Sequence, residues 1–282
     1  MNQSFNLRRW FLLVREHGSR NGKRYWLSLL AIGGIMVGFY SFFILAGQNA
    51  IPLNIQSASY FFGLFFSGCL FGSMLFDDLN NTPKAISALL LPASHLEKLL
   101  CRLFFGIVVF FISYTLIYYL VNIPMVNLSN NLGAGWHKLG REANLPFKRS
   151  GIENVFSNRQ EMQPLPFPFK LNPYLFEAFF VAQSAFILGS VYFRKFSFIK
   201  TAICLFALFF LLFIYFGVVL SKMTPDGCWY DSLTSWHINQ NNITGHVLLP
   251  GWADRIFYFL IGYPFAFIFL TVTYFRLKEK EI

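Results

Sequence analysis

The chain reads DDLNNTPKAISALLLPASHLEKLLCR at residues 77–102, between two long apolar runs. This stretch is the only charged interruption between those runs. A plain connection between two helices needs only a few residues, whereas this one has more than twenty and contains signals for two helix starts. We therefore interpret it as a cytoplasmic helical elbow on which another protein can dock. An ordinary hairpin connection with good helix caps is the alternative reading.

The first helix start lies in the middle of the elbow. Thr82 can cap a helix that has Pro83 at its first position, where a missing backbone N–H costs nothing. The helix then continues to Leu91, and Pro92 breaks it. The pattern predicts a short cytoplasmic helix, Pro83–Leu91.

The second helix start has the pattern of a capping box. The Ser94 side chain can accept one unpaired backbone N–H, and the Glu97 side chain can accept the other. The new helix continues through Lys98 into the next apolar run. The residues expected to form the docking elbow are Asp77, Asp78, Lys84, Leu89, Leu90, Pro92, Ser94, Glu97 and Lys98.

The composition identifies the class of protein. Of the 282 residues, 55% are hydrophobic and only 13% are charged, about half the charged share of soluble domains. We therefore expect an all-α, polytopic integral membrane protein. The net charge of +10 does not indicate nucleic-acid binding, because the basic residues cluster at the ends of apolar segments, where they set membrane topology.

Six apolar segments are long enough to cross the hydrocarbon core, which takes about 20 residues. They are residues 26–46, 57–76, 103–121, 174–193, 201–220 and 256–275. Fifteen of the 23 Lys and Arg residues fall on the side that holds both ends of the chain and the elbow. The excess of positive charge predicts that this side, with both termini, is cytoplasmic.

Three further segments complete the single transmembrane domain, residues 1–282. Residues 5–17 carry apolar side chains at helical spacing and predict an interfacial helix in the headgroup layer, with a frayed basic tail as the alternative. Residues 122–173 and 221–254 are the two outer segments. The first contains several prolines and mixed charge, and we expect little regular structure in it.

Small residues recur at four-residue spacing in the spans and can allow close helix packing. A contact surface of the first, second and fourth spans is one interpretation, and chance spacing is the other. The candidate packing residues are Gly34, Gly38, Gly63, Gly68 and Gly72.

The elbow and the order of the spans resemble a known family. Phe76-Asp77-Asp78-Leu79, a lysine six residues after Asp78, Leu90-Leu91-Pro92-Ala93-Ser94 and Glu97-Lys98 are similar to the bacterial permease-like branch of type-two ATP-binding-cassette exporters. The membrane subunit of that family also has a leading interfacial helix, six spans and a short cytoplasmic helix between the second and third.

The resemblance implies a function and a set of partners. Residues 83–91 would be the coupling helix that touches a separate cytoplasmic ATPase, and ATP and Mg²⁺ would bind that ATPase. A second permease copy or a paralogue would complete the pathway in the bacterial inner membrane. The outer segment 122–173 is longer than in better-known members, which puts the geometry of the outer gate in doubt.

The residues themselves indicate no enzyme. The nearest approach to a phosphate-binding loop, Gly18–Arg24, has the wrong spacing, so we expect no nucleotide cofactor in this chain. The histidines of the outer segments match no zinc-binding spacing, so we expect no metal site. Glu177 and Gln183 are the candidates for a transport pathway, with helix stabilisation and a helix–helix hydrogen bond as the respective alternatives. A non-transporting membrane anchor or assembly subunit is the alternative function.

Overall fold

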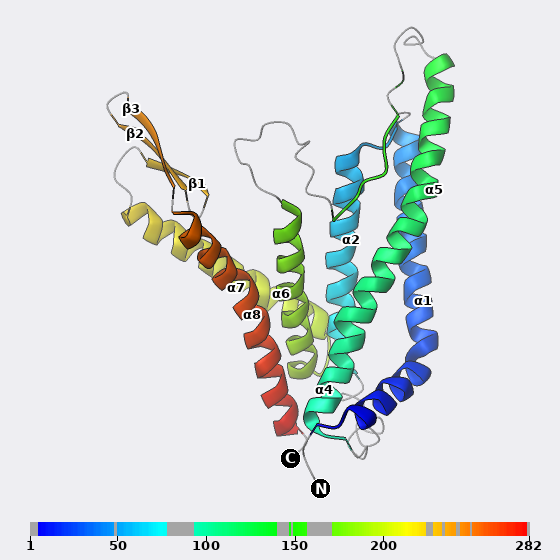
Figure 1. The fold of residues 1–282 in the computed structure, drawn as a ribbon, viewed down its shortest axis with the longest axis vertical. Coiled ribbons are helices and arrows are strands. Elements are labelled where there is room, and N and C mark those ends of the chain that lie inside the picture. The colour runs from blue at the N-terminus through cyan, green and yellow to red at the C-terminus, as the bar shows by residue number, and fades with distance from the viewer. Residues whose placement is uncertain are drawn as a thin grey trace.

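The computed structural model describes residues 5–47, 50–77, 93–139, 147, 149–156, 171–223, 228–232, 235–240, 243–248 and 250–280. Its helices are α1 (Leu7–Gly47), α2 (Leu53–Met74), α4 (His95–Leu103), the π-helix η2 (Phe104–Val109), α5 (Phe110–Leu139), α6 (Leu171–Tyr192), α7 (Ser197–Met223) and α8 (Gly251–Lys280). Its strands are β1 (Cys228–Ser232), β2 (Ser235–Gln240) and β3 (Ile243–Leu248) (Figure 1).

Among the residues that the structure describes, five helical segments are long and apolar enough to cross a membrane. They overlap the first five predicted spans over most of their length, so the chain is a multi-pass membrane protein with a helical membrane part. The predicted sixth span, residues 256–275, falls inside the 30-residue helix α8. Its assignment as a span stays a prediction.

The first helix is longer than the sequence indicated. The predicted interfacial helix 5–17 and the span 26–46 belong to one helix of 41 residues, α1. Figure 1 shows that α1 bends near the base of the molecule, so that its first part runs across the base and its second part rises along the bundle. The two parts therefore keep the different directions expected of an interfacial helix and a span, without a break in hydrogen bonding between them.

The third span also continues further than predicted. Instead of ending near residue 121, the helix runs on to Leu139 with Pro124 inside it, so the outer segment 122–173 begins as a helix. Polar residues beyond the predicted end find partners: Asn122 donates to Gln56 Oε1 at 3.1 Å, and Asn130 donates to the Ser150 carbonyl at 2.9 Å. Because these polar side chains are hydrogen-bonded within the protein, the helix continues beyond the apolar run.

Gln56 holds the outer ends of these helices together. Its side chain is completely buried, and its amide donates to the Ile51 and Gly151 carbonyls at 3.2 and 3.0 Å. Its Oε1 atom also accepts from the Glu153 backbone N–H at 3.0 Å. A buried amide needs all these partners, and together they tie residues 149–156 to α2 and α5.

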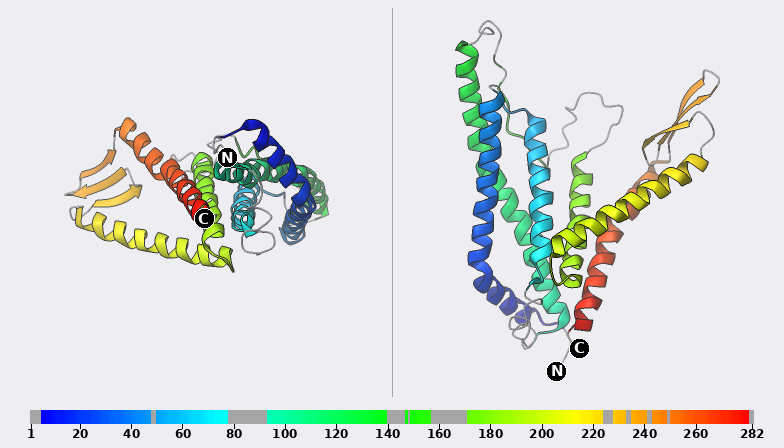
Figure 2. Two further views of the ribbon diagram at one scale, coloured as in Figure 1. Left: turned by 90° about the horizontal axis from the view of Figure 1, so that it is seen from below. Right: turned by 180° about the vertical axis from the view of Figure 1, so that it is seen from behind.

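Helix α6 lies between two groups of helices. It packs against α2 on one side and against α7 and α8 on the other, while α5 packs against α1 and α2 (Figure 2). The interior between α2 and α5 is aromatic and contains buried tyrosines whose hydroxyl groups are paired. Tyr114 donates to the Tyr60 carbonyl at 2.7 Å, and Tyr118 donates to the Gln56 carbonyl at 3.0 Å.

The outer segment 221–254 contains a small sheet, which the all-α prediction did not include. Its strands are antiparallel in the order β1-β2-β3, and they lie at the outer end of the molecule between α7 and α8 (Figure 1). The β2–β3 pairing is regular, from Ser235 opposite Leu248 to Gln240 opposite Ile243. The helical fold predicted from the composition thus describes the membrane part, and within the described ranges strands occur only in the outer segment 221–254.

The glycines that were expected to pack differ in their surroundings. A Cβ atom on Gly68 would lie 2.5 Å from the Phe179 ring of α6, and one on Gly63 would lie within contact of Tyr114. Gly72 faces the Gln183 carbonyl and Ile187 of α6. Among the described residues, no atom lies within 4 Å of a Cβ atom on Gly34 or Gly38. The first span therefore does not use these glycines to contact α2 or α6 within one chain.

This contrast gives a matched pair of variants. Gly68→Leu forces a side chain into the buried Phe179 ring and is expected to destabilise the protein by about 1–3 kcal/mol, as overpacking does. Gly34→Leu makes the same chemical change where space is open and is expected to leave the thermal midpoint unchanged. Thermal unfolding of the purified protein in detergent measures both. Equal midpoints for the two variants would contradict the α2–α6 contact.

Candidate functional site

The capping box expected at the end of the elbow is present. The Glu97 backbone N–H donates to Ser94 Oγ at 3.2 Å, and the Ser94 backbone N–H donates to Glu97 Oε2 at 2.9 Å. Two N–H groups at the start of α4 are thereby paired. The cap fixes where the helix begins, immediately after the elbow's undescribed part.

The second oxygen of Glu97 joins the elbow to the beginning of the chain. Glu97 Oε1 accepts from the Asn6 backbone N–H at 2.7 Å and from Arg9 Nη2 at 3.0 Å. The Glu97 side chain is completely buried, whereas Arg9 is 35% exposed. One carboxylate therefore caps α4 and at the same time holds the first turn of α1 against it.

The carboxyl group of Glu97 stays ionised in this environment. Burial raises its pKa, but the backbone N–H groups of Ser94 and Asn6 and the Arg9 guanidinium together outweigh burial, so that the pKa is lowered. The group precedes the apolar part of its helix, in the elbow. A charged carboxylate accepts these hydrogen bonds more strongly than a neutral one does.

Arg102 brings the two ends of the elbow together. Its Nη1 atom donates to the Leu75 carbonyl at the end of α2, at 2.7 Å. Its guanidinium also lies over the Phe76 ring, 4.7 Å from the centroid, in a cation–π contact. The residues on either side of the elbow's undescribed part are thus held next to each other.

A hydrophobic cluster connects this junction to the rest of the helices. We call it the base cluster, and its buried members come from the end of α2, from α4, from α6 and from α8. They are Leu75, Phe76, Leu99, Ile187, Val191 and Leu277. Four helices therefore meet where the elbow enters and leaves the bundle, and close packing transmits a displacement of one to the others.

The end of α8 is fixed to α6 in the same region. The Arg276 guanidinium lies 4.9 Å from the centroid of the Tyr192 ring and pairs with Glu279 at 2.5 Å. The last turns of α8 lie at the same end of the molecule as the first turns of α1 (Figures 1 and 2).

The residues predicted for the elbow fall into two groups. Asp77, Ser94, Glu97 and Lys98 lie within the described residues and flank the junction. Those outside the described residues are Asp78, Lys84, Leu89, Leu90 and Pro92, with the whole predicted helix 83–91. The docking role of that helix stays a prediction.

Of the two pathway candidates, Gln183 has a packing role in the structure. Its side chain is buried and donates to the Gly106 carbonyl in η2. A π-helical turn disturbs the regular backbone pairing of a helix, and the Gln183 amide supplies a donor there. The helix–helix hydrogen bond considered as the alternative is therefore formed. Glu177 is half-buried near the start of α6.

Sequence reasoning did not find the partners of Glu97 and Arg102. The spacing of Ser94 and Glu97 indicated the local cap, because it depends on three neighbouring residues. Arg9 is 88 positions from Glu97 along the chain, and no local pattern distinguishes it from the other basic residues of the leading segment. The only available signal was that a glutamate beside a long apolar run requires a cation.

Comparisons with known protein families, with curated proteins and with solved structures found no match for this chain.

The role of Glu97 predicts how stability depends on pH. Because its pKa is lowered in the folded state, its contribution is complete above the ordinary carboxyl range near 4.5 and is lost as the pH falls through the lowered value. Glu97→Gln is expected to cost about 2 kcal/mol at pH 7, since hydrogen bonds to a charged group are lost. The stability of the variant is also expected to fall less between pH 7 and pH 3, because the variant lacks this carboxyl group. Thermal unfolding between pH 7 and pH 3 measures both effects.

Glu279→Gln is the matched control. Glu279 is 61% exposed and pairs with Arg276 within one helix, so its loss is expected to cost less than about 1 kcal/mol. If the two variants had the same midpoint and the same pH profile, the buried junction at Glu97 would not be a stabilising feature.

Proposed function

We propose that the chain is the transmembrane subunit of an ATP-driven exporter of the type-two ATP-binding-cassette class. It acts in the bacterial cytoplasmic membrane with both termini in the cytoplasm. The observation that supports this function best is the junction at the elbow, where Glu97 and Arg102 join the first turn of α1 and the end of α2 to α4. This junction connects the two flanks of the elbow to α1 and α2, as a docking element that moves helices would require.

Through the junction, a movement of the elbow would be transmitted to several helices. A push on the predicted coupling helix 83–91 would reach Phe76 at one end of the elbow and Ser94 at the other. From Phe76 it would pass into the base cluster and so into α6 and α8. From Ser94 it would pass into the helical segment that continues from α4 through η2 and α5 to Leu139.

Nucleotide chemistry belongs to a different chain in this proposal. The partner is a cytoplasmic ATPase that binds ATP and Mg²⁺, and its closure would move the elbows of two permease copies or of this chain and a paralogue. The π-helical turn η2 lies directly beyond α4, and π-helical turns are frequent at functional sites.

The pathway in this proposal runs between subunits. The interior of one chain is filled by a hydrophobic core with buried tyrosines such as Tyr60 and Tyr118, and Gln183 is occupied in helix packing. Glu177, which is half-buried, remains the candidate among the acids of the spans for lining a pathway, since acids inside membranes are costly and usually functional.

The docking role is tested by making the elbow acidic. Leu89→Glu together with Leu90→Glu is expected to release an ATPase that co-purifies with the tagged full-length chain from its native membrane, because burying two carboxylates in an apolar contact is unfavourable. Mass spectrometry of the co-purified proteins identifies the ATPase by its phosphate-binding loop. Phe196→Glu is the control, because Phe196 is 74% exposed in the connection between α6 and α7 and lies outside the elbow.

Retention of the ATPase by the double variant would refute the docking role. The alternative function, a non-transporting membrane anchor or assembly subunit, has its own outcome. If the reconstituted complex turned over ATP without any movement of solute across the membrane, the anchor would replace the exporter.

A further inference from the structure

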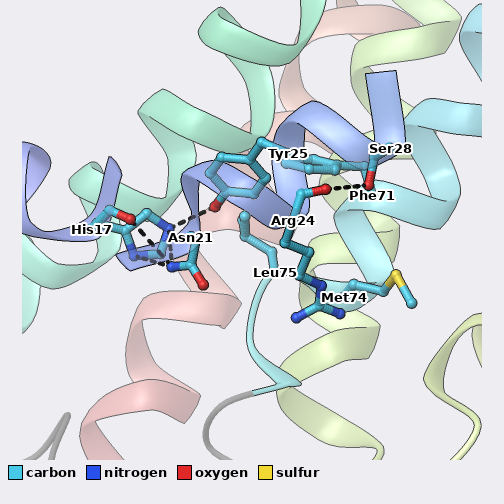
Figure 3. A pocket seen from close by; sticks show the side chains of 8 residues that line it. All are labelled: His17, Asn21, Arg24, Tyr25, Ser28, Phe71, Met74 and Leu75. Carbon is cyan, nitrogen blue, oxygen red and sulfur yellow. Dashed lines mark hydrogen bonds between the residues drawn. The ribbon is translucent and has the colours of Figure 1, made fainter. Parts of the chain in front are cut away.

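A pocket opens between α1 and α2 near the base of the molecule, beside the elbow junction, with which it shares Leu75 (Figure 3). The part of α1 that lines it carries three of the six leading basic residues, Arg20, Lys23 and Arg24. The residues that line it are His17, Asn21, Arg24, Tyr25, Ser28, Phe71, Met74 and Leu75.

The lining is divided by polarity. Helix α1 supplies the polar side chains of His17, Asn21, Arg24 and Ser28, whereas the end of α2 supplies the apolar wall. Figure 3 shows the guanidinium of Arg24 apart from the cluster formed by His17, Asn21 and Tyr25. A ligand that fills this pocket must therefore combine a polar head with an apolar body.

The walls of the pocket are held in place by aromatic contacts. His17 Nε2 and the Tyr25 hydroxyl are hydrogen-bonded at 2.7 Å. The Tyr25 ring stacks on Phe105 of η2 with centroids 5.7 Å apart and contacts Phe71 of α2 at 5.4 Å. The Phe105 ring also contacts the His17 ring at 4.9 Å. Three helical elements thus fix the site before any ligand binds, which lowers the entropic cost of binding.

The electrostatic surroundings favour an anion. Arg24 is exposed, and its guanidinium forms no ion pair with any residue that the structure describes. Arg15 and Lys23 add further exposed positive charge in the same stretch of helix. The acidic residue of this stretch, Glu16, forms an ion pair with Arg20 at 3.9 Å. The mouth of the pocket therefore carries a net positive charge.

We propose that this pocket binds the headgroup of an anionic phospholipid from the leaflet on the basic side of the membrane. The phosphate would pair with the Arg24 guanidinium, and the first carbons of the acyl chains would cover the apolar wall at Met74 and Leu75. Basic pockets between membrane helices on the cytoplasmic side bind such headgroups. The apolar wall favours a lipid over free phosphate.

The proposal does not depend on the exporter function. It requires only that α1 leaves the headgroup layer at this point, as its bend and its basic residues indicate. A bound lipid would hold the bend of α1 next to Phe105, in the same helical segment as Glu97. The lipid would then stabilise the orientation of the interfacial part of α1.

The test uses the full-length protein purified in a neutral detergent. Dioleoylphosphatidylglycerol is titrated, and bound lipid is measured by native mass spectrometry together with the rise in the thermal midpoint that binding produces. Arg24→Gln is expected to weaken this binding roughly tenfold or more, because a charge-assisted hydrogen bond is lost. Lys23→Gln removes the same charge from the neighbouring position outside the pocket and is expected to weaken binding less than about twofold.

A second variant separates a built pocket from a diffuse positive surface. Met74→Trp fills the apolar side without changing any charge and is expected to weaken binding of dioleoylphosphatidylglycerol. Equal losses in Arg24→Gln and Lys23→Gln, with no loss in Met74→Trp, would overturn the proposal in favour of non-specific attraction. Equal binding of dioleoylphosphatidylcholine, or full competition by inorganic phosphate, would also overturn it.

Discussion

The structure at the base of the molecule depends on one buried carboxylate. Glu97 has no exposed surface, and a carboxylate removed from water must be surrounded by donors or be neutralised. Here the donors come from three places: the Ser94 backbone at the start of α4, the Asn6 backbone and the Arg9 side chain. Because the same group satisfies all three, α4 cannot begin elsewhere and the first turn of α1 cannot leave it without exposing an unpaired charge.

This constraint also connects the residues that flank the elbow to several helices. Arg102 binds the Leu75 carbonyl on the other side of the elbow, and the base cluster of buried apolar side chains lies beneath the junction. Polar contacts fix the positions of the two ends of the elbow, and apolar packing connects those ends to α6 and α8. A force on the elbow would therefore move helices together, as the proposed exporter function requires.

The sequence predicted the features that depend on neighbouring residues or on long apolar runs. The five spans and the cap of Ser94 and Glu97 are of this kind, since hydropathy and three-residue spacing determine them. The extension of α5 to Leu139 was missed because Pro124 and the polar residues after it read as a helix end. The residues that hydrogen-bond to the polar side chains of this extension, such as Gln56, come from distant parts of the chain. The strands of the outer segment were missed as well, and Arg9 could not be chosen from among several equivalent basic residues.

Arg9 and Glu97 act as a coupled pair that joins α1 to the elbow. A double-mutant cycle with Arg9→Met, Glu97→Gln and the combined variant measures this coupling directly from the free energy of unfolding at pH 7. The structure predicts a coupling free energy of about 1 kcal/mol or more, because one partner is fully buried. Additive effects of the two substitutions would contradict the claim, since each residue would then act alone.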